Sequence, residues 1–137
     1  MSNVIWHFSN EHAQWQKKNC TVVSAPATLE ENGQRYQRME GFGGCFNELG
    51  YRALSHLPNE KRTALFSELY SPAAANFNVC RLPIGANDYA EDWYSLDETP
   101  CDYSLSRFSI ERDKHCLIPY IKEAQAYQPE MTLFASP

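Results

Sequence analysis

The order of elements in this sequence predicts an α/β fold with a parallel sheet or barrel. Two observations carry the prediction. Short apolar segments recur at 39–46, 77–84 and 131–136, and stretches with helical spacing of apolar residues separate them. Strands that are joined through helices lie parallel, because the helix returns the chain to the same edge of the sheet.

Residues 1–36 precede this alternation and have a different character. Trp6, Phe8 and Trp15 sit among polar residues, and Thr21–Val23 resembles a short strand. We therefore expect an irregular or β-rich lead-in.

The first predicted strand, 39–46, is rich in glycine and leads into a helix. Asn47 is a plausible N-cap for this helix, with Glu48 in the first turn, where a negative charge is favourable. Ala53, Leu54 and Leu57 follow at helical spacing. A second helix is expected after Pro58, with Asn59 as its candidate cap and a buried stripe formed by Leu65, Phe66 and Leu69.

The second predicted strand, 77–84, is followed by a long polar stretch, 85–109, that is more than a simple connection. Long loops on a rigid scaffold often carry function. A third helix is expected over about 112–127, where Pro119 is tolerable only near the first turn. The third strand, 131–136, follows Pro129.

Composition narrows the class of protein. The 137 residues are 43% hydrophobic and 21% charged, which suits one folded domain. The sequence lacks an apolar run long enough for a transmembrane segment and has no visible signal peptide, so a cytoplasmic location is favoured, although the compartment stays open. A net charge of −5 without a basic cluster argues against nucleic-acid binding and favours an uncharged small molecule or polymer.

Several kinds of site have no support in the sequence. The five cysteines are scattered, so we expect reduced and mostly buried thiols, neither a disulfide framework nor a zinc site. The glycines at 41–44 do not continue as a dinucleotide fingerprint, because position 46 is Phe. Each of the four histidines stands alone, so neither metal chemistry nor a nucleophilic triad is indicated, and no cofactor is expected.

The most informative segment runs from Arg81 to Tyr94. Arg81 lies inside an apolar strand, Asn87 and Asp88 follow its carboxyl end, and Trp93 and Tyr94 come next in the loop. Parallel α/β folds bind substrates at the carboxyl ends of their strands. Polar side chains beside flat aromatic rings suit a sugar, whose hydroxyl groups need hydrogen bonds and whose C–H faces stack on rings.

A structural interpretation of these residues is also open. Asp88 could be a loop or capping residue, and Arg81 could belong to a structural ion pair, since a buried arginine needs a carboxylate partner. Glu48 is either a site acid or a helix first-turn residue. The other acids of the long loop resemble a solvated face: Glu91, Asp92, Asp97, Glu98 and Asp102.

Six segments in order resemble glycoside hydrolase family 30, the glucosylceramidase-like enzymes. They are Gly41–Glu48, Asn76–Asp88, Asp92–Ser95, Phe108–Asp113, Leu117–Ala124 and Leu133–Pro137. The resemblance implies a (β/α)8 TIM barrel, of which 37–137 would form roughly the first three strands, with 1–36 in an accessory β domain. It also implies a retaining β-glycosidase with two catalytic glutamates on later strands, so that these residues alone would be an inactive amino-terminal fragment.

The resemblance also implies roles for single residues. Asp88 matches the aspartate that binds hydroxyls of the terminal sugar, and Arg81 matches the arginine beneath the site that supports the nucleophile. Trp93 and Tyr94 belong to the loop that would edge the pocket. The implied substrate is a β-glucoside, either a glucosylceramide-type lipid of sphingolipid metabolism or a β-glucan.

Four alternatives remain open at this point. Within the enzyme class they are a β-1,6-glucanase and a β-xylosidase. Outside it they are a non-catalytic sugar-binding module and a small doubly wound domain, which would need a nucleotide loop that the sequence lacks. The oligomeric state is also open.

Overall fold

The computed structural model describes residues 5–20, 24–26 and 32–137, and the chain divides into two compact units, Met1–Gln37 and Arg38–Pro137. In the first unit, β1 (Trp6–Asn10) pairs antiparallel with β2 (Ala13–Lys18). The side chain of Asn10 shapes the turn between them by accepting the backbone N–H groups of residues 12 and 13, both at 2.9 Å. The strand expected at Thr21–Val23 lies outside the described residues. Assignment of 1–36 to an accessory domain stays a prediction.

The second unit contains parallel pairing. β3 (Val79–Pro83) pairs in parallel with β4 (Thr132–Ser136), so both predicted strands are present with slightly shorter bounds. The segment predicted as a strand at 39–46 also runs parallel to β3, but it forms two isolated bridges, Phe42 with Phe77 and Cys45 with Arg81.

The regular ladder is interrupted because the carbonyl oxygen of Phe42 accepts two consecutive backbone N–H groups. These are the N–H of Asn78 at 2.9 Å and that of Val79 at 3.1 Å. The Asn78 side chain also takes part in this pairing, because its Oδ1 accepts the N–H of Phe42 at 3.2 Å.

Two helices connect this segment to β3. α1 (Glu48–Ser55) begins as predicted, with Asn47 Oδ1 accepting the Gly50 N–H at 2.7 Å. α2 (Asn59–Tyr70) is capped at Pro58 without a side-chain hydrogen bond, so the prediction of Asn59 as the cap was wrong: Asn59 is already helical.

The predicted apolar stripes of these two helices differ in burial. Phe66 is buried on α2, between half-buried Leu65 and Leu69. On α1 the stripe is weaker, because Leu54 is half-buried and Ala53 is exposed.

The third helix is shorter than predicted. A 3-10 turn, η1 (Asp113–His115), precedes α3 (Leu117–Gln125). Cys116 separates them because its φ of −138° and ψ of −69° are not helical. Pro119 consequently lies in the first turn of α3, where a missing N–H leaves no helical hydrogen bond unmade. No helix or strand forms between Pro83 and Asp113, as expected of the long loop.

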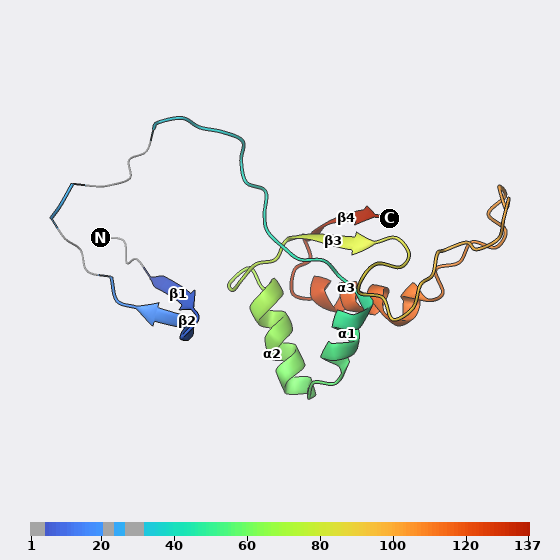
Figure 1. The fold of residues 1–137 in the computed structure, drawn as a ribbon, viewed down its shortest axis with the longest axis horizontal. Helices are drawn as coiled ribbons and strands as arrows, with labels where there is room; N and C mark the ends of the chain where they lie inside the picture. The colour runs from blue at the N-terminus through green and yellow to red at the C-terminus, as the bar shows by residue number, and fades with distance from the viewer. Residues whose placement is uncertain (1–4, 21–23, 27–31) are drawn as a thin grey trace. The chain divides into compact units, whose positions relative to one another are not determined.

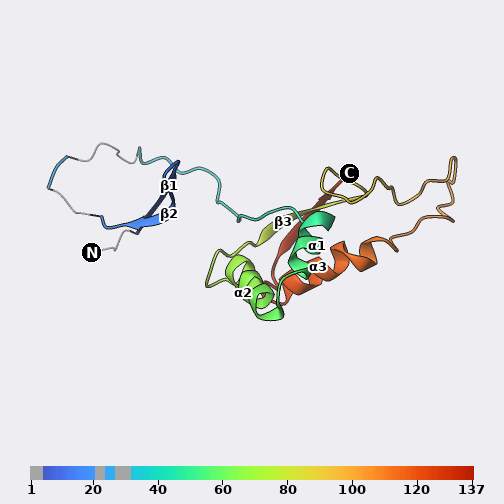
Figure 2. The same ribbon diagram turned by 60° about the horizontal axis from the view of Figure 1, so that its bottom comes forward.

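The three helices cover one face of the strands (Figures 1 and 2). Their core includes Phe46, Phe66, Tyr70, Cys80, Leu117, Ala124 and Met131. The Phe46 ring meets the Tyr120 ring edge to face, with centroids 4.8 Å apart. Alternation along a strand places Cys80 toward this core and Arg81 on the opposite face. Arg81 thus lies on the face of the strands that the helices leave open.

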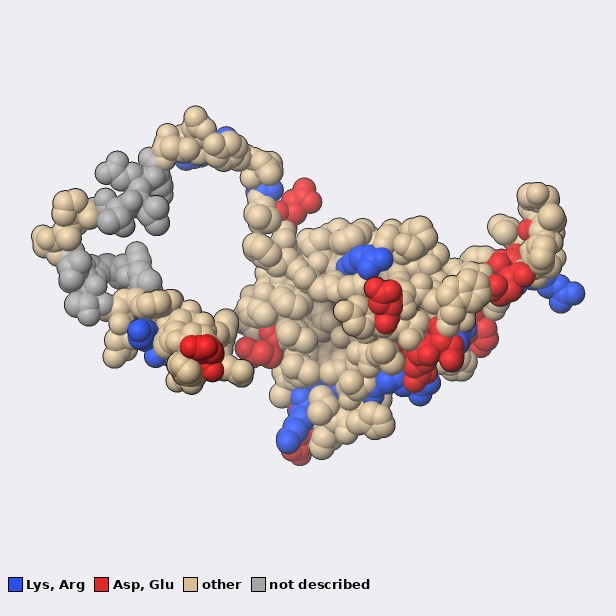
Figure 3. Space-filling model, in the orientation of Figure 1, with Lys and Arg blue, Asp and Glu red and all other residues tan. Residues whose placement is uncertain are grey.

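Surface features follow from this arrangement. On the face that Figure 3 shows, blue and red side chains of 38–137 are interspersed, and acidic side chains gather on the long segment after β3. Cys80 and Cys116 are buried, but Cys20, Cys45 and Cys101 are exposed, so the expectation of mostly buried thiols was wrong. Within the described residues no helix is long and apolar enough to cross a membrane.

Candidate functional site

Arg81 is held at the carboxyl side of the parallel segments. Its Nε–H donates to Ser136 Oγ of β4 at 2.6 Å, and its Nη1 lies 3.6 Å from Cys45 Sγ of the preceding segment. The described residues offer Arg81 no carboxylate, since its partners are a hydroxyl and a thiol, so the expected carboxylate partner stays a prediction.

The loop after β3 turns back on itself at once. Gly85 has φ of +80°, a conformation that glycine adopts without steric cost, and the Ala86 N–H donates to the Tyr94 carbonyl at 2.9 Å. Asn87 Oδ1 accepts the Tyr89 N–H at 3.0 Å, which leaves exposed Asp88 at the corner of the turn. The side chain of Asn87 thus serves the turn, while Asp88 is free to face solvent.

Three of the sequence-predicted site residues lie together. Asn87, Asp88 and Trp93 are among the residues that line a shallow cavity of about 300 Å³. The Trp93 side chain is exposed, with 78% of its surface accessible. An exposed indole beside a carboxylate and an amide can stack on a sugar ring and bind its hydroxyl groups.

Tyr94 is not among the residues that line this cavity. Its hydroxyl donates to Asp113 Oδ1 at 2.8 Å, and the Arg112 guanidinium lies over its ring, 4.4 Å from the centroid. Burial, followed by the hydrogen bond to Asp113, raises the pKa of the Tyr94 hydroxyl, which therefore stays protonated. The structure gives Tyr94 a part in holding the loop instead of lining the cavity.

The acids of the long loop contact neighbouring arginines but stay exposed. Glu91 lies 2.9 Å from Arg52 of α1 and Asp92 lies 3.7 Å from Arg112, and both acids are exposed, as expected of a solvated face. Asp102 also has a structural part, since its carboxylate accepts Ser104, Ser106 and the backbone of Arg107. Those hydrogen bonds lower the pKa of Asp102 to about 2.

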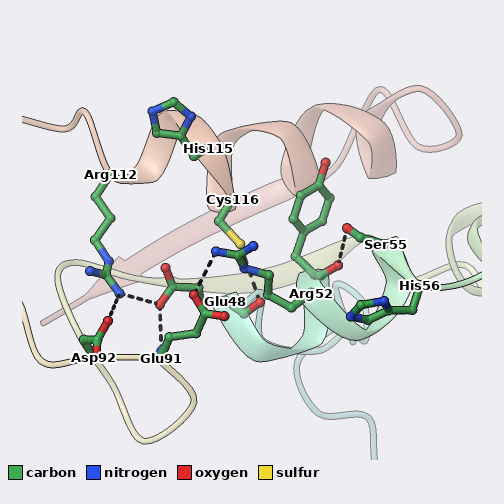
Figure 4. A pocket seen from close by; sticks show the side chains of 10 residues that line it. Glu48, Arg52, Ser55, His56, Glu91, Asp92, Arg112, His115 and Cys116 are labelled. Carbon is green, nitrogen blue, oxygen red and sulfur yellow. Dashed lines mark hydrogen bonds and ion pairs between the residues drawn. The ribbon is translucent and has the colours of Figure 1, made fainter.

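Glu48 is the buried acid of this region, with 7% of its surface exposed. Its Oε2 accepts the Glu91 backbone N–H at 2.8 Å and Arg112 Nη2 at 3.0 Å (Figure 4). Burial raises the pKa of Glu48, but hydrogen bonds from Arg112 and the Glu91 amide outweigh it, so the net pKa is below the ordinary value. Neither sequence interpretation of Glu48, as a site acid or as a first-turn residue, anticipated this contact with the loop.

A larger cavity of about 530 Å³ lies beside Glu48. It is lined by α1, η1 and the loop: Glu48, Tyr51, Arg52, Ser55, His56, Glu91, Asp92, Arg112, His115 and Cys116 (Figure 4). Most of these residues belong to the helical layer, and Glu91 and Asp92 of the loop line the smaller cavity as well. Arg81 lies on the open face of the strands. Among the described residues no group of three or more histidines, cysteines or acids is placed to hold a metal ion.

Residues 39–137 match the TIM-barrel domain of glycosyl hydrolase family 30. The chain is 32% identical over 106 residues to the endo-1,6-beta-D-glucanase of Neurospora crassa, covering 75% of this chain and 22% of that protein. It is 29% identical over 121 residues to the lysosomal acid glucosylceramidase of Mus musculus, covering 87% of this chain and 23% of that protein. The chain thus spans less than a quarter of each of these curated relatives.

A solved structure also supports the TIM-barrel fold. The endo-beta1,6-glucanase BT3312 superposes with a TM-score of 0.70 and 25% sequence identity, over 78% of this chain and 24% of that structure. The parallel segments described above are therefore part of a TIM barrel, and within the described residues they do not close into one.

Proposed function

This chain belongs to glycosyl hydrolase family 30, and from that premise we propose that the protein as a whole is a retaining β-glycosidase acting on β-glucosides. These residues would supply one wall of its sugar-binding pocket. The observation that carries the proposal is the placement of Arg81, which pairs with no acid among the described residues, in the middle of β3 and of a shallow cavity just past the carboxyl end of the same strand.

Each part of that wall has a chemical task in the proposal. Asp88 accepts hydrogen bonds from the hydroxyls of the terminal sugar, and Trp93 offers an exposed ring for its C–H face. Asn87 shapes the turn that presents Asp88. Arg81 supports a catalytic carboxylate by its positive charge, which favours the ionised form that attacks the anomeric carbon. Tyr94 contributes only by holding the loop.

We place the two catalytic glutamates of the retaining mechanism on parts of the barrel outside these 137 residues. Two of the described glutamates are already engaged: Glu48 is buried against the loop, and Glu123 pairs with Arg62 between α2 and α3, while exposed Asp88 is assigned to the sugar hydroxyls. The 137 residues alone are consequently expected to show no turnover.

The substrate class rests on the relatives. One relative is named a glucosylceramidase and two are named 1,6-glucanases, so a glucosylceramide-type lipid and a β-1,6-glucan are both candidate substrates. A β-xyloside is a third candidate. These candidate substrates share a β-linked sugar, and we propose glucose on the non-reducing side of the cleaved bond.

The test uses the full-length protein that contains these residues and an aryl β-glucoside. Asp88→Ala is expected to lower kcat/KM by about 10- to 100-fold, because charged hydrogen bonds to sugar hydroxyls are lost. Glu130→Ala is the matched control, since exposed Glu130 precedes β4 at the opposite end of the sheet. Equal activity of Asp88→Ala and the control would refute the site.

A second arm concerns the 137 residues by themselves. Turnover that survives purification and disappears in Asp88→Ala would show that the catalytic acids have been misplaced. Stabilisation of this chain by glucosides without turnover of the full-length protein would favour the non-catalytic sugar-binding module instead.

A further inference from the structure

We propose that Glu48 and Arg112 are positioning residues for the sugar-binding loop: together they fix residues 89–94 and thereby set the affinity for the sugar. The inference rests on the proposed function and adds to it two residues that touch no substrate. Its basis is a network in which two side chains from different elements grip the loop on both sides of Trp93.

The first grip is on the backbone. Glu48 Oε2, at the start of α1, accepts the N–H of Glu91 at 2.8 Å. One residue further along α1, the Leu49 N–H donates to the Tyr89 carbonyl at 3.0 Å. The first turn of α1 therefore holds the loop at two alternate residues directly after Asp88.

The second grip is on side chains. The Arg112 guanidinium lies 3.0 Å from Glu48 Oε2, 3.7 Å from Asp92 Oδ2 and 4.4 Å from the centroid of the Tyr94 ring. Asp92 and Tyr94 are the two neighbours of Trp93. The Asp92 side chain is 79% exposed, so the contacts of Arg112 with Glu48 and with the Tyr94 ring carry most of this grip beside the exposed Trp93.

Burial distinguishes this pair from the other charges on the loop. The Glu48 side chain is 9% exposed and that of Arg112 is 34% exposed. The pair of Arg52 with Glu91 is 60% and 37% exposed, and exposed ion pairs contribute little because water and salt screen them. Both hydrogen bonds of the Glu48 carboxylate fall on Oε2, which ties the loop backbone and Arg112 to the same oxygen.

Residue-resolved amide hydrogen exchange on the full-length protein tests the grip directly. Glu48→Ala removes the acceptor of the Glu91 N–H, and exchange at Glu91 is expected to speed up by about 10-fold or more. Glu48→Gln retains an acceptor oxygen and is expected to restore most of the protection. Arg52→Ala, which breaks only the exposed pair, serves as the control and should leave exchange at Glu91 within about threefold of the wild type.

Kinetics with an aryl β-glucoside test the consequence for the sugar. Glu48→Ala and Arg112→Lys are expected to raise KM by about 5- to 50-fold while kcat changes by less than about threefold, because loop placement affects sugar binding more than the chemical step. Arg112→Lys keeps the charge but not the flat guanidinium that lies on Tyr94, so it gives a second variant if Glu48→Ala folds poorly.

The results distinguish the positioning role of Glu48 and Arg112 from the proposed β-glycosidase function. Unchanged exchange at Glu91 in Glu48→Ala overturns the grip, and faster exchange with an unchanged KM overturns its effect on the sugar. A wild-type protein that turns over no β-glucoside refutes the proposed function, and that result does not depend on the exchange measurement. Faster exchange together with a raised KM supports the inference.

Discussion

Replacing Gly43 with alanine is expected to destabilise residues 38–137 by about 2–4 kcal/mol. Gly43 lies where the segment before α1 approaches β3. A Cβ atom at this position would stand 2.7 Å from the carbonyl carbon of Val79 and 2.8 Å from Cys80 Sγ, and closer still to the carbonyl oxygen. Real Cβ atoms stay at least 3.0 Å from such neighbours, so one segment must move.

The cost follows from what that movement breaks. Separation by about 1 Å would disrupt the hydrogen bonds from Val79 N–H to the Phe42 carbonyl, 3.1 Å, and from Arg81 N–H to the Gly44 carbonyl, 2.9 Å. Each backbone hydrogen bond contributes roughly 1 kcal/mol net, and the loosened contact at Cys80 adds a packing loss of similar size.

Gly44 supplies a matched control one residue away. A Cβ at Gly44 meets nothing within 4 Å, so Gly44→Ala should change the free energy of unfolding by less than about 0.5 kcal/mol. Urea unfolding followed by far-UV circular dichroism reports this unit, since α1, α2 and α3 all belong to it. If the free energies of unfolding of the two variants agree within about 0.5 kcal/mol, then position 43 does not require glycine for the close approach to β3.

Three further outcomes are expected, each measured by urea unfolding of the same chain. Phe66→Ala should cost about 3–5 kcal/mol, because Phe66 is 1% exposed, whereas Phe134→Ala should cost little, because Phe134 is 52% exposed; similar losses would contradict the described core. Ser136→Ala should cost about 1 kcal/mol by removing the acceptor of Arg81 Nε–H at 2.6 Å, and an unaltered midpoint would mean that this hydrogen bond does not hold Arg81. The pKa of Glu48 is lowered in the folded protein, since hydrogen bonds from Arg112 and the Glu91 amide outweigh the effect of burial. The ionised carboxylate therefore stabilises the fold fully above the ordinary pKa of 4.5, and this stabilisation is lost as the pH falls through the lower pKa of the folded state. Glu48→Gln should therefore flatten the fall in stability as the pH drops below 4.5, and an identical pH dependence in the variant would exclude Glu48 as its source.

The elements of the second unit were largely predictable because their signals are local. The Asn47 cap, the apolar periodicity around Phe66 and the β-branched and apolar residues near Val79 each act within a few positions of the chain. The errors lie where a local signal competes with a tertiary one. The segment around Phe42 reads as a strand, but its pairing with Asn78 breaks the regular ladder.

The candidate site was predictable only in part. Asn87, Asp88 and Trp93 are close in sequence, and the turn at Gly85 brings them to one cavity, so a local motif sufficed. The partners of Arg81 could not be inferred this way. An arginine inside a strand needs a hydrogen-bond acceptor, but the sequence alone does not identify that acceptor as the hydroxyl of Ser136, 55 residues away.

The sequence by itself determined the α/β order, the parallel connections and the family, because these depend on periodicity, turn chemistry and ordered motifs along the chain. Only the tertiary structure decided that Glu48 holds the loop that follows β3. Its two partners, Glu91 and Arg112, are 43 and 64 residues away. Hydrogen bonds over such separations exist only after the helices pack on the strands, so the physical reason for the difference is the range over which each interaction acts.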